Sequence, residues 1–282
     1  MDQPRPVLGL HDRIHGCLLG AAIGAELAYA RVAHPERYQF ANPADVLAFV
    51  PQRATRQEGL EKRRTAGSLV PFVALGVDSY LKAGGRARPE DLADCLRHNK
   101  DIAAGYFTWD GVHTTQEVLQ EGMHPRIAGM LNAPSGMLCA AMPAVGSYHF
   151  ADPEYAYLDG VELASVSAPR EAADWAGLCA AAIAAAYDPA ATPESITETV
   201  FAIARRHCID LYYLANHLLW NARDAEADDA TFAAWWMTCG GRGDGRQDSA
   251  WIGHHPIMYV LPLLRRYGND ATCAAAVRFM AL

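Results

Sequence analysis

The sequence predicts an all-α protein that forms a single compact domain. Apolar residues recur at spacings of three and four through most of the 282 residues, helix-end signals lie between these stretches, and alternating β-branched strands are absent. With 51% hydrophobic and 20% charged residues, the chain has the composition of a globular protein with a full core. No repeat or shift in composition marks a boundary, so we expect residues 1–282 to form one domain of about a dozen helices.

The first predicted helix begins near Asp12, because the apolar residues that follow fall on one stripe. Gly16, Gly20 and Gly24 share another face of this helix. Their spacing of four would let a second backbone approach closely, and ordinary packing explains it.

Turn and capping residues mark the helices that follow. A helix over 68–82 ends at Gly84, a residue suited to a left-handed exit. Pro89 is typical of a first helical position, Thr114 opens a capping-box pattern, and Thr192 is followed by proline and glutamate. Apolar spacing also predicts helices over 154–166, 172–186, 196–206, 210–220, 232–237 and 258–267.

The charge balance argues against nucleic acid as a partner. The chain has 24 Lys and Arg against 32 Asp and Glu, which gives a formal net charge of −8 and a pI near 5.7. Its dense basic run, over residues 53–64, is typical of a solvated surface loop.

Cysteine usage and the N-terminal residues predict a cytoplasmic protein. The seven cysteines are odd in number, widely spaced and without a CxxC pair, so we expect reduced thiols and no structural zinc. Residues 1–10 lack a secretory signal pattern, and no apolar run is long enough to span a bilayer. We therefore expect no membrane partner.

Polar residues suited to a site gather in irregular segments, which the sequence places at 33–64, 105–113, 122–136 and 240–255. The loop over 240–251 alternates charged residues with glycines. Arg242 and Arg246 could wrap an anion such as a phosphate, while Asp244 or Asp248 could act as a base. A solvated surface loop is the alternative interpretation.

The segment over 106–113 combines aromatic, acidic and imidazole side chains. Tyr106 or Trp109 could stack on a base or pyridine ring, and Asp110 or His113 could exchange a proton. Aromatic residues in such a segment also commonly cover the core, so both interpretations stay open.

Five segments resemble, in order and spacing, those of the ADP-ribosylglycohydrolase family, which includes the dinitrogenase reductase-activating glycohydrolases. The segments are 13–24, 65–68, 135–137, 164–167 and 260–270. The resemblance covers nearly the whole chain. It implies an all-helical fold and cleavage of a glycosidic bond at ribose C1.

The departures from the family pattern concern its metal ligands. The family holds two magnesium or manganese ions with a Thr-Asp-Asp-Thr segment and a later Asp-Thr-Asp-Thr motif. Here Thr65 and Ser68 keep the hydroxyls, but Ala66 and Gly67 replace both aspartates, and Ala25 replaces a first-helix aspartate. The later motif is absent from the 282 residues. Because such ions need about six oxygen ligands, several of them anionic, we expect no metal and no other cofactor.

The resemblance also bears on substrate contacts. Ser135 and Gly136 match the family loop that holds the ribosyl phosphate, and Thr65 and Ser68 remain candidate contacts. Ala168 and Ala140 stand where the family has a histidine and an arginine. The inherited contacts to ADP-ribose are therefore changed.

Three functions are compatible with this pattern. The first is a metal-independent glycosidase that hydrolyses the N-glycosidic bond of a ribosyl-phosphate, nucleotide-like or NAD-derived small molecule in specialised metabolism. Glu26 follows the lost first-helix aspartate, and burial would raise its pKa toward an acid-base value, although it could instead lie on the helix surface. The others are a binding protein without catalysis, and a lyase or isomerase acting on a ribosylated intermediate. A homo-oligomer is compatible with each.

Overall fold

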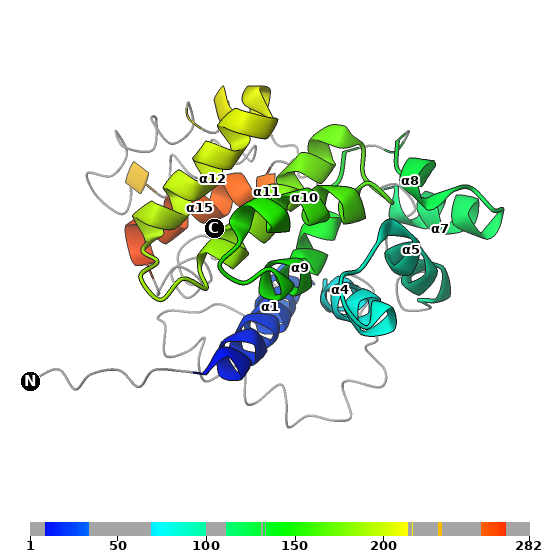
Figure 1. Ribbon diagram of the computed structural model, residues 1–282, viewed down its shortest axis with the longest axis horizontal. Coiled ribbons are helices and arrows are strands. Elements are labelled where there is room, and N and C mark those ends of the chain that lie inside the picture. The colour runs from blue at the N-terminus through cyan, green and yellow to red at the C-terminus, as the bar shows by residue number, and fades with distance from the viewer. Residues whose placement is uncertain are drawn as a thin grey trace, which may run out of the picture.

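The computed structural model describes residues 9–33, 69–99, 111–130, 132, 134–213, 216, 231–232 and 255–268. These residues form eleven helices and no strand, which confirms the predicted all-α class (Figure 1). Within them, only the backbone is described for 26–33, 113, 255–256 and 258–259. None of the helices in these ranges is long and apolar enough to cross a membrane.

The predicted helices that lie in the described residues appear in the expected order, with ends within a few residues of the expected ones. The described helices are α1 (Leu10–Ala33), α4 (Val70–Ala83), α5 (Pro89–His98), α7 (Val112–Gln120), α8 (Pro125–Ala128), the 3-10 helix η1 (Met137–Ala141), α9 (Met142–Tyr148), α10 (Pro153–Ala164), α11 (Arg170–Ala185), α12 (Pro193–His207) and α15 (His255–Tyr267). Of these, α8, η1 and α9 were not predicted. The predicted helices over 210–220 and 232–237 lie largely outside the described residues.

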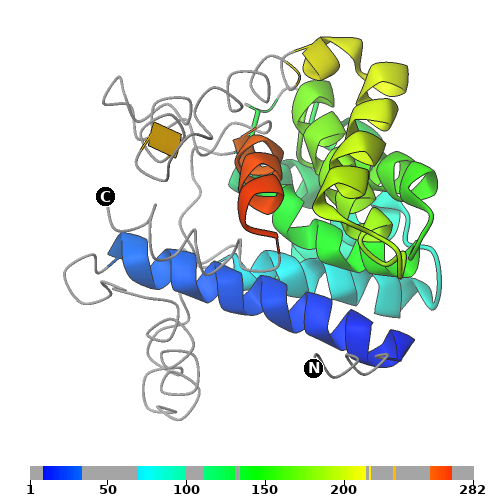
Figure 2. The same ribbon diagram turned by 90° about the vertical axis from the view of Figure 1, so that its left-hand side faces the viewer.

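Helices α10 and α11 form the centre of the described fold. A Cβ added at Gly160 on α10 would lie 2.9 Å from Gly177 Cα on α11, so the two backbones are in close contact. Helices α5, α7 and α8 lie toward one end of this pair, and α12 and α15 lie toward the other (Figure 1). The long helix α1 runs alongside α4 and α9 (Figure 2). In this arrangement the turn after α10 lies near the start of α7.

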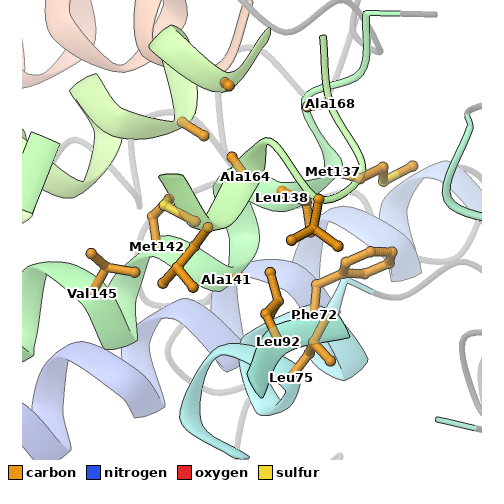
Figure 3. Close-up of a cluster of buried hydrophobic side chains, with 14 of the residues drawn as sticks. Phe72, Leu75, Leu92, Met137, Leu138, Ala141, Met142, Val145, Ala164 and Ala168 are labelled. Atoms are coloured by element: carbon orange, nitrogen blue, oxygen red, sulfur yellow. The ribbon is translucent and has the colours of Figure 1, made fainter. Parts of the chain in front are cut away.

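Two clusters of buried side chains flank the α10–α11 pair. The first joins α4, α5, η1 and α9, with Phe72, Leu75 and Leu92 at most 1% exposed (Figure 3). The second joins α10, α11, α12 and α15 around Tyr157 and Trp175. Burial of such apolar side chains contributes about 1.5–3 kcal/mol each, so these clusters hold the helices in place.

Most of the predicted helix ends are confirmed. Gly84 ends α4 with φ +63°, and Pro89 is the first residue of α5. Thr192 caps α12 in a reciprocal capping box: its Oγ1 accepts a hydrogen bond from the Ser195 N–H, and its own N–H donates to Ser195 Oγ.

The predicted start of α7 is wrong. The helix begins at Val112, after Gly111 with φ +89°, so Thr114 lies inside its first turn and is not the N-cap. The hydroxyl of the next residue, Thr115, bonds back to the Gly111 carbonyl at 2.8 Å. Glycine tolerates the left-handed conformation, and the chain therefore turns into the helix three residues earlier than the capping pattern indicated.

The structure also bears on two further expectations, one for the segment over 122–136 and one for the glycines of α1. The segment over 122–136 is not wholly irregular, because it contains the short helix α8. Among the described residues, no atom lies within 4 Å of a Cβ built at Gly16, Gly20 or Gly24. The close backbone approach that their spacing allows is thus not formed by that part of the chain.

Candidate functional site

Among the predicted site residues, Ser135 and Gly136 are the two whose surroundings the structure describes in full. For Glu26 in α1 and His113 in α7 the structure describes the backbone but not the side chain. The remaining predicted site residues also lie outside the described ranges: Thr65, Ser68, Tyr106, Trp109, Asp110, Arg242, Asp244, Arg246 and Asp248. Their roles stay predictions.

Ser135 lies in the turn that leads into η1. Its side chain is buried, and its Oγ accepts a hydrogen bond from the backbone N–H of Met137 at 3.3 Å. Gly136 follows with φ −81° and precedes the first residue of η1. Because a hydroxyl carries one hydrogen and two lone pairs, Ser135 keeps its O–H for another partner. The loop is thus held in place without using the hydroxyl donor.

Asn132, three residues before Ser135, is the centre of a polar network that the sequence did not single out. Its Nδ2 lies 3.1 Å from the Gly111 carbonyl oxygen, 2.7 Å from Thr115 Oγ1 and 2.9 Å from the Ser167 carbonyl oxygen. Thr115 Oγ1 also lies 3.0 Å from Ser167 Oγ. Thr115 and Ser167 are 0% and 2% exposed, so this network is in the interior. It joins the start of α7, the loop before η1 and the turn after α10.

Two glycines permit the close approach of these three segments. A Cβ at Gly111 would lie 2.8 Å from Asn132 Cβ, and one at Gly129 would lie 2.5 Å from both Ala168 N and Ser165 O. Real Cβ contacts are longer than this, so any side chain there would push the segments apart. The network depends on glycine at both positions.

The chemistry of this network is that of neutral hydroxyl and amide groups. Hydroxyls and amides can bind a phosphate or a ribose hydroxyl, but they do not supply the anionic oxygens that a hard divalent ion requires. No group of three or more His, Cys, Asp or Glu that could hold a metal ion occurs in the described ranges. The 65–68 segment lies outside those ranges, so the expectation of a metal-free site stays a prediction.

Ala168, at the position of the family histidine, belongs to the apolar core. Ala168 is 4% exposed and belongs to the same buried cluster as Met137 and Leu138, as Figure 3 shows. Ala140, at the position of the family arginine, packs against this cluster. Apolar side chains thus stand at both positions.

The buried carboxylates that the structure describes are both paired with arginine. Asp159 is 1% exposed and receives hydrogen bonds from Arg86 at 2.9 and 3.0 Å and from His149 at 2.6 Å. Burial alone would raise its pKa, but these hydrogen bonds outweigh it and hold the pKa of Asp159 below its usual value.

Asp174, 5% exposed, is paired in the same way. It accepts hydrogen bonds from Arg170 Nε at 2.9 and 3.0 Å and from the Tyr157 hydroxyl at 2.8 Å. These donors occupy both carboxylate oxygens of Asp174, which leaves it poorly placed to take a proton from a substrate. Both residues therefore have a structural role, and the sequence patterns that we analysed did not indicate either ion pair.

Comparison with known proteins gives one result that covers nearly the whole chain. A model of the ADP-ribosylglycohydrolase family matches residues 6–279 of the 282. No curated protein and no solved structure shows a significant match. The match agrees with the all-helical architecture and with the order of the five segments identified in the sequence. The chain therefore belongs to the ADP-ribosylglycohydrolase family, whose members are hydrolases that act on ADP-ribosyl-type substrates.

Proposed function

We propose that this protein is a metal-independent N-ribosyl hydrolase. Its substrate is a small ribosyl-phosphate, nucleotide-like or NAD-derived molecule, and the products are a free base and a free ribosyl compound. Family membership supports the glycosidic chemistry. The type of bond and the independence from metal are the further steps of this proposal.

One observation carries the proposal most directly. The buried network beside the loop of Ser135 consists of hydroxyls, a side-chain amide and backbone carbonyls, with no carboxylate among its hydrogen-bond partners. The sequence also lacks carboxylates where the resemblance implies them, because Ala25, Ala66 and Gly67 stand at three positions where the family has aspartates. A network of neutral polar groups, with uncharged residues at the three aspartate positions, suits a phosphate-bearing sugar better than a pair of divalent ions.

The reaction needs an acid and a base at the sugar. The bond from ribose C1 to the base nitrogen breaks with its electron pair leaving on nitrogen, and an oxocarbenium-like C1 is captured by water. Glu26 would accept the proton of that water, or protonate the leaving nitrogen. Asp244 or Asp248 would take the complementary role.

Binding would be divided among the predicted segments. Arg242 and Arg246 would neutralise the phosphate, together with the hydroxyl of Ser135. Tyr106 or Trp109 would stack on the leaving ring. With the ring held and the phosphate anchored, ribose C1 would face the carboxylates.

A mass-spectrometric screen tests this function. Chelator-treated protein is incubated with NAD, nicotinamide mononucleotide, ADP-ribosylated arginine and simple nucleosides, and free base and free ribose or ribose phosphate are measured. Release from one of them establishes the activity and its substrate class. No release from any, together with thermal stabilisation by one of these compounds, contradicts catalysis and favours a binding protein.

The role of Glu26 is tested in the same assay. Glu26→Gln removes the acid-base group and should lower turnover by about 10²–10⁴-fold while leaving the thermal unfolding midpoint unchanged. Asp12→Asn on the same helix is the matched control, because the Asp12 side chain is exposed in the first turn of α1. Full activity of Glu26→Gln would exclude Glu26 from the mechanism. Inhibition by a chelator that added magnesium reverses would contradict metal independence.

A further inference from the structure

The side chain of Asn132 connects the turn after α10 to two segments that contain predicted site residues. Gly111, whose carbonyl it binds, directly follows the aromatic and acidic segment that ends at Asp110. Ser167, whose carbonyl it also binds, directly precedes Ala168. Asn132 itself directly precedes the loop that contains Ser135. We propose that Asn132 is the positioning residue of the substrate site, which fixes these three segments relative to one another.

Hydrogen-bond accounting supports a positioning role. The two Nδ2 hydrogens of Asn132 serve three acceptors, and two of those acceptors are carbonyl oxygens that cannot donate. The Thr115 hydroxyl accepts one of these hydrogens and has one of its own, which it gives to the Gly111 carbonyl or to Ser167 Oγ. The amide of Asn132 therefore donates to the Thr115 oxygen and leaves the Thr115 hydrogen for one of the other two partners.

The inference rests on the proposed function, because these segments matter for catalysis only if the substrate binds among them. The hydrogen-bond partners of Asn132 lie far from it along the chain, so its side chain joins segments that are not neighbours in sequence. Asn132 lies 21 residues from Gly111, 17 from Thr115 and 35 from Ser167. Without it, these segments keep the Thr115–Ser167 hydrogen bond and the packing around the glycines, and the loop of Asn132 loses its three side-chain contacts.

Asn132→Asp is the sharpest variant, because it keeps the size of the side chain and replaces its donor by a carboxylate acceptor. The carboxylate would face the Gly111 and Ser167 carbonyl oxygens. Protonation at lower pH restores one O–H donor, so activity should recover partly as the pH falls. Asn132→Leu has no donor at any pH and should not recover.

Gln116→Glu, in the helix that Asn132 contacts through Thr115, is the matched control. Gln116 is 3% exposed, and its Nε2 donates to the Leu96 carbonyl at 2.7 Å and to the Asn99 carbonyl at 3.2 Å, at the end of α5. The substitution makes the same change from amide to carboxylate against the same kind of acceptor. Any general effect of a carboxylate placed next to α7 appears in both variants, whereas loss of positioning appears only in Asn132→Asp.

Hydrogen exchange measured by mass spectrometry tests the inference without a substrate. In Asn132→Asp, peptides over 111–115, 135–139 and 165–170 should exchange about tenfold faster or more, while Gln116→Glu should accelerate exchange near residues 92–99. Unchanged exchange in Asn132→Asp, or equal loosening of the three segments in Gln116→Glu, would overturn the inference.

Kinetics on the substrate found in the screen give the functional test. Well below its unfolding midpoint, Asn132→Asp should lose about 100-fold in kcat/KM at neutral pH, and Gln116→Glu should lose none. Full kcat/KM in folded Asn132→Asp would overturn the positioning role while the hydrolase function stands. If the wild type hydrolyses none of the compounds, the proposed function fails, and the exchange experiment still decides whether Asn132 fixes the three segments.

Discussion

The contact between α10 and α11 gives the most direct test of the packing, through Gly177→Ala. A Cβ at Gly177 would lie 2.6 Å from Val161 Cγ2 and 2.7 Å from the Tyr157 carbonyl oxygen. The valine methyl can move by rotation, but the carbonyl belongs to the backbone of α10. An ordinary contact at about 3.4 Å therefore requires the two helices to separate by several tenths of an ångström.

The expected cost follows from two opposing effects. Overpacking of this kind costs about 1–3 kcal/mol, and contact with backbone places Gly177→Ala at the upper end of that range. Replacing a helical glycine by alanine stabilises the helix by about 1 kcal/mol. The net loss in the free energy of unfolding is about 2 kcal/mol, which lowers the unfolding midpoint by about 4–8 °C.

Thermal unfolding followed by far-UV circular dichroism measures this change, with Gly20→Ala as the matched control. Gly20 lies inside α1, and no described atom lies within 4 Å of a Cβ built there. Gly20→Ala should therefore stabilise the protein by about 0.5–1 kcal/mol. If Gly177→Ala were as stable as the wild type or more stable, the close contact of α10 with α11 would be refuted.

Two further changes test the ion pairs and the helix ends. Asp159→Asn removes the charged acceptor for Arg86 and His149 and should lower the free energy of unfolding by about 2 kcal/mol in a urea titration, a cost limited by the exposure of Arg86. Because the pKa of Asp159 is lowered in the folded state, its stabilisation is present above its unfolded pKa of about 4 and is lost as the pH falls through the folded pKa. A pH series in which Asp159→Asn loses as much stability on acidification as the wild type would contradict this. Thr192→Ala should cost about 1 kcal/mol by loss of the α12 cap, and an unchanged unfolding midpoint would exclude that role.

The sequence predicted the features of the fold that depend on neighbouring residues. The helix expected over 68–82 is observed at Val70–Ala83, and its stop at Gly84 and the start at Pro89 are both confirmed. Each of these depends on apolar spacing and backbone preferences within a few residues. Local signals of this kind need no knowledge of the tertiary contacts.

The start of α7 and the network of Asn132 could not be predicted in the same way. The pattern at Thr114 is a local signal, but the helix begins earlier because Gly111 meets Asn132, 21 residues along the chain. The contact to Ser167 spans 35 residues. A single asparagine beside an irregular segment has many possible partners, and only the packing of α7 against the turn after α10 selects these.

The electrostatics of the site bear on whether a function has been replaced or lost. In the family pattern, the aspartates hold two divalent ions, and removing the ions alone would leave carboxylates that repel a phosphate. In this chain Ala25, Ala66 and Gly67 stand at three of those positions, and the loop over 240–251 carries two arginines and two aspartates. If the proposed site binds no metal, loss of the carboxylates together with the ions avoids uncompensated negative charge beside the substrate phosphate. The joint absence of these three charges is therefore compatible with a site that still binds a phosphate, as the proposed function requires.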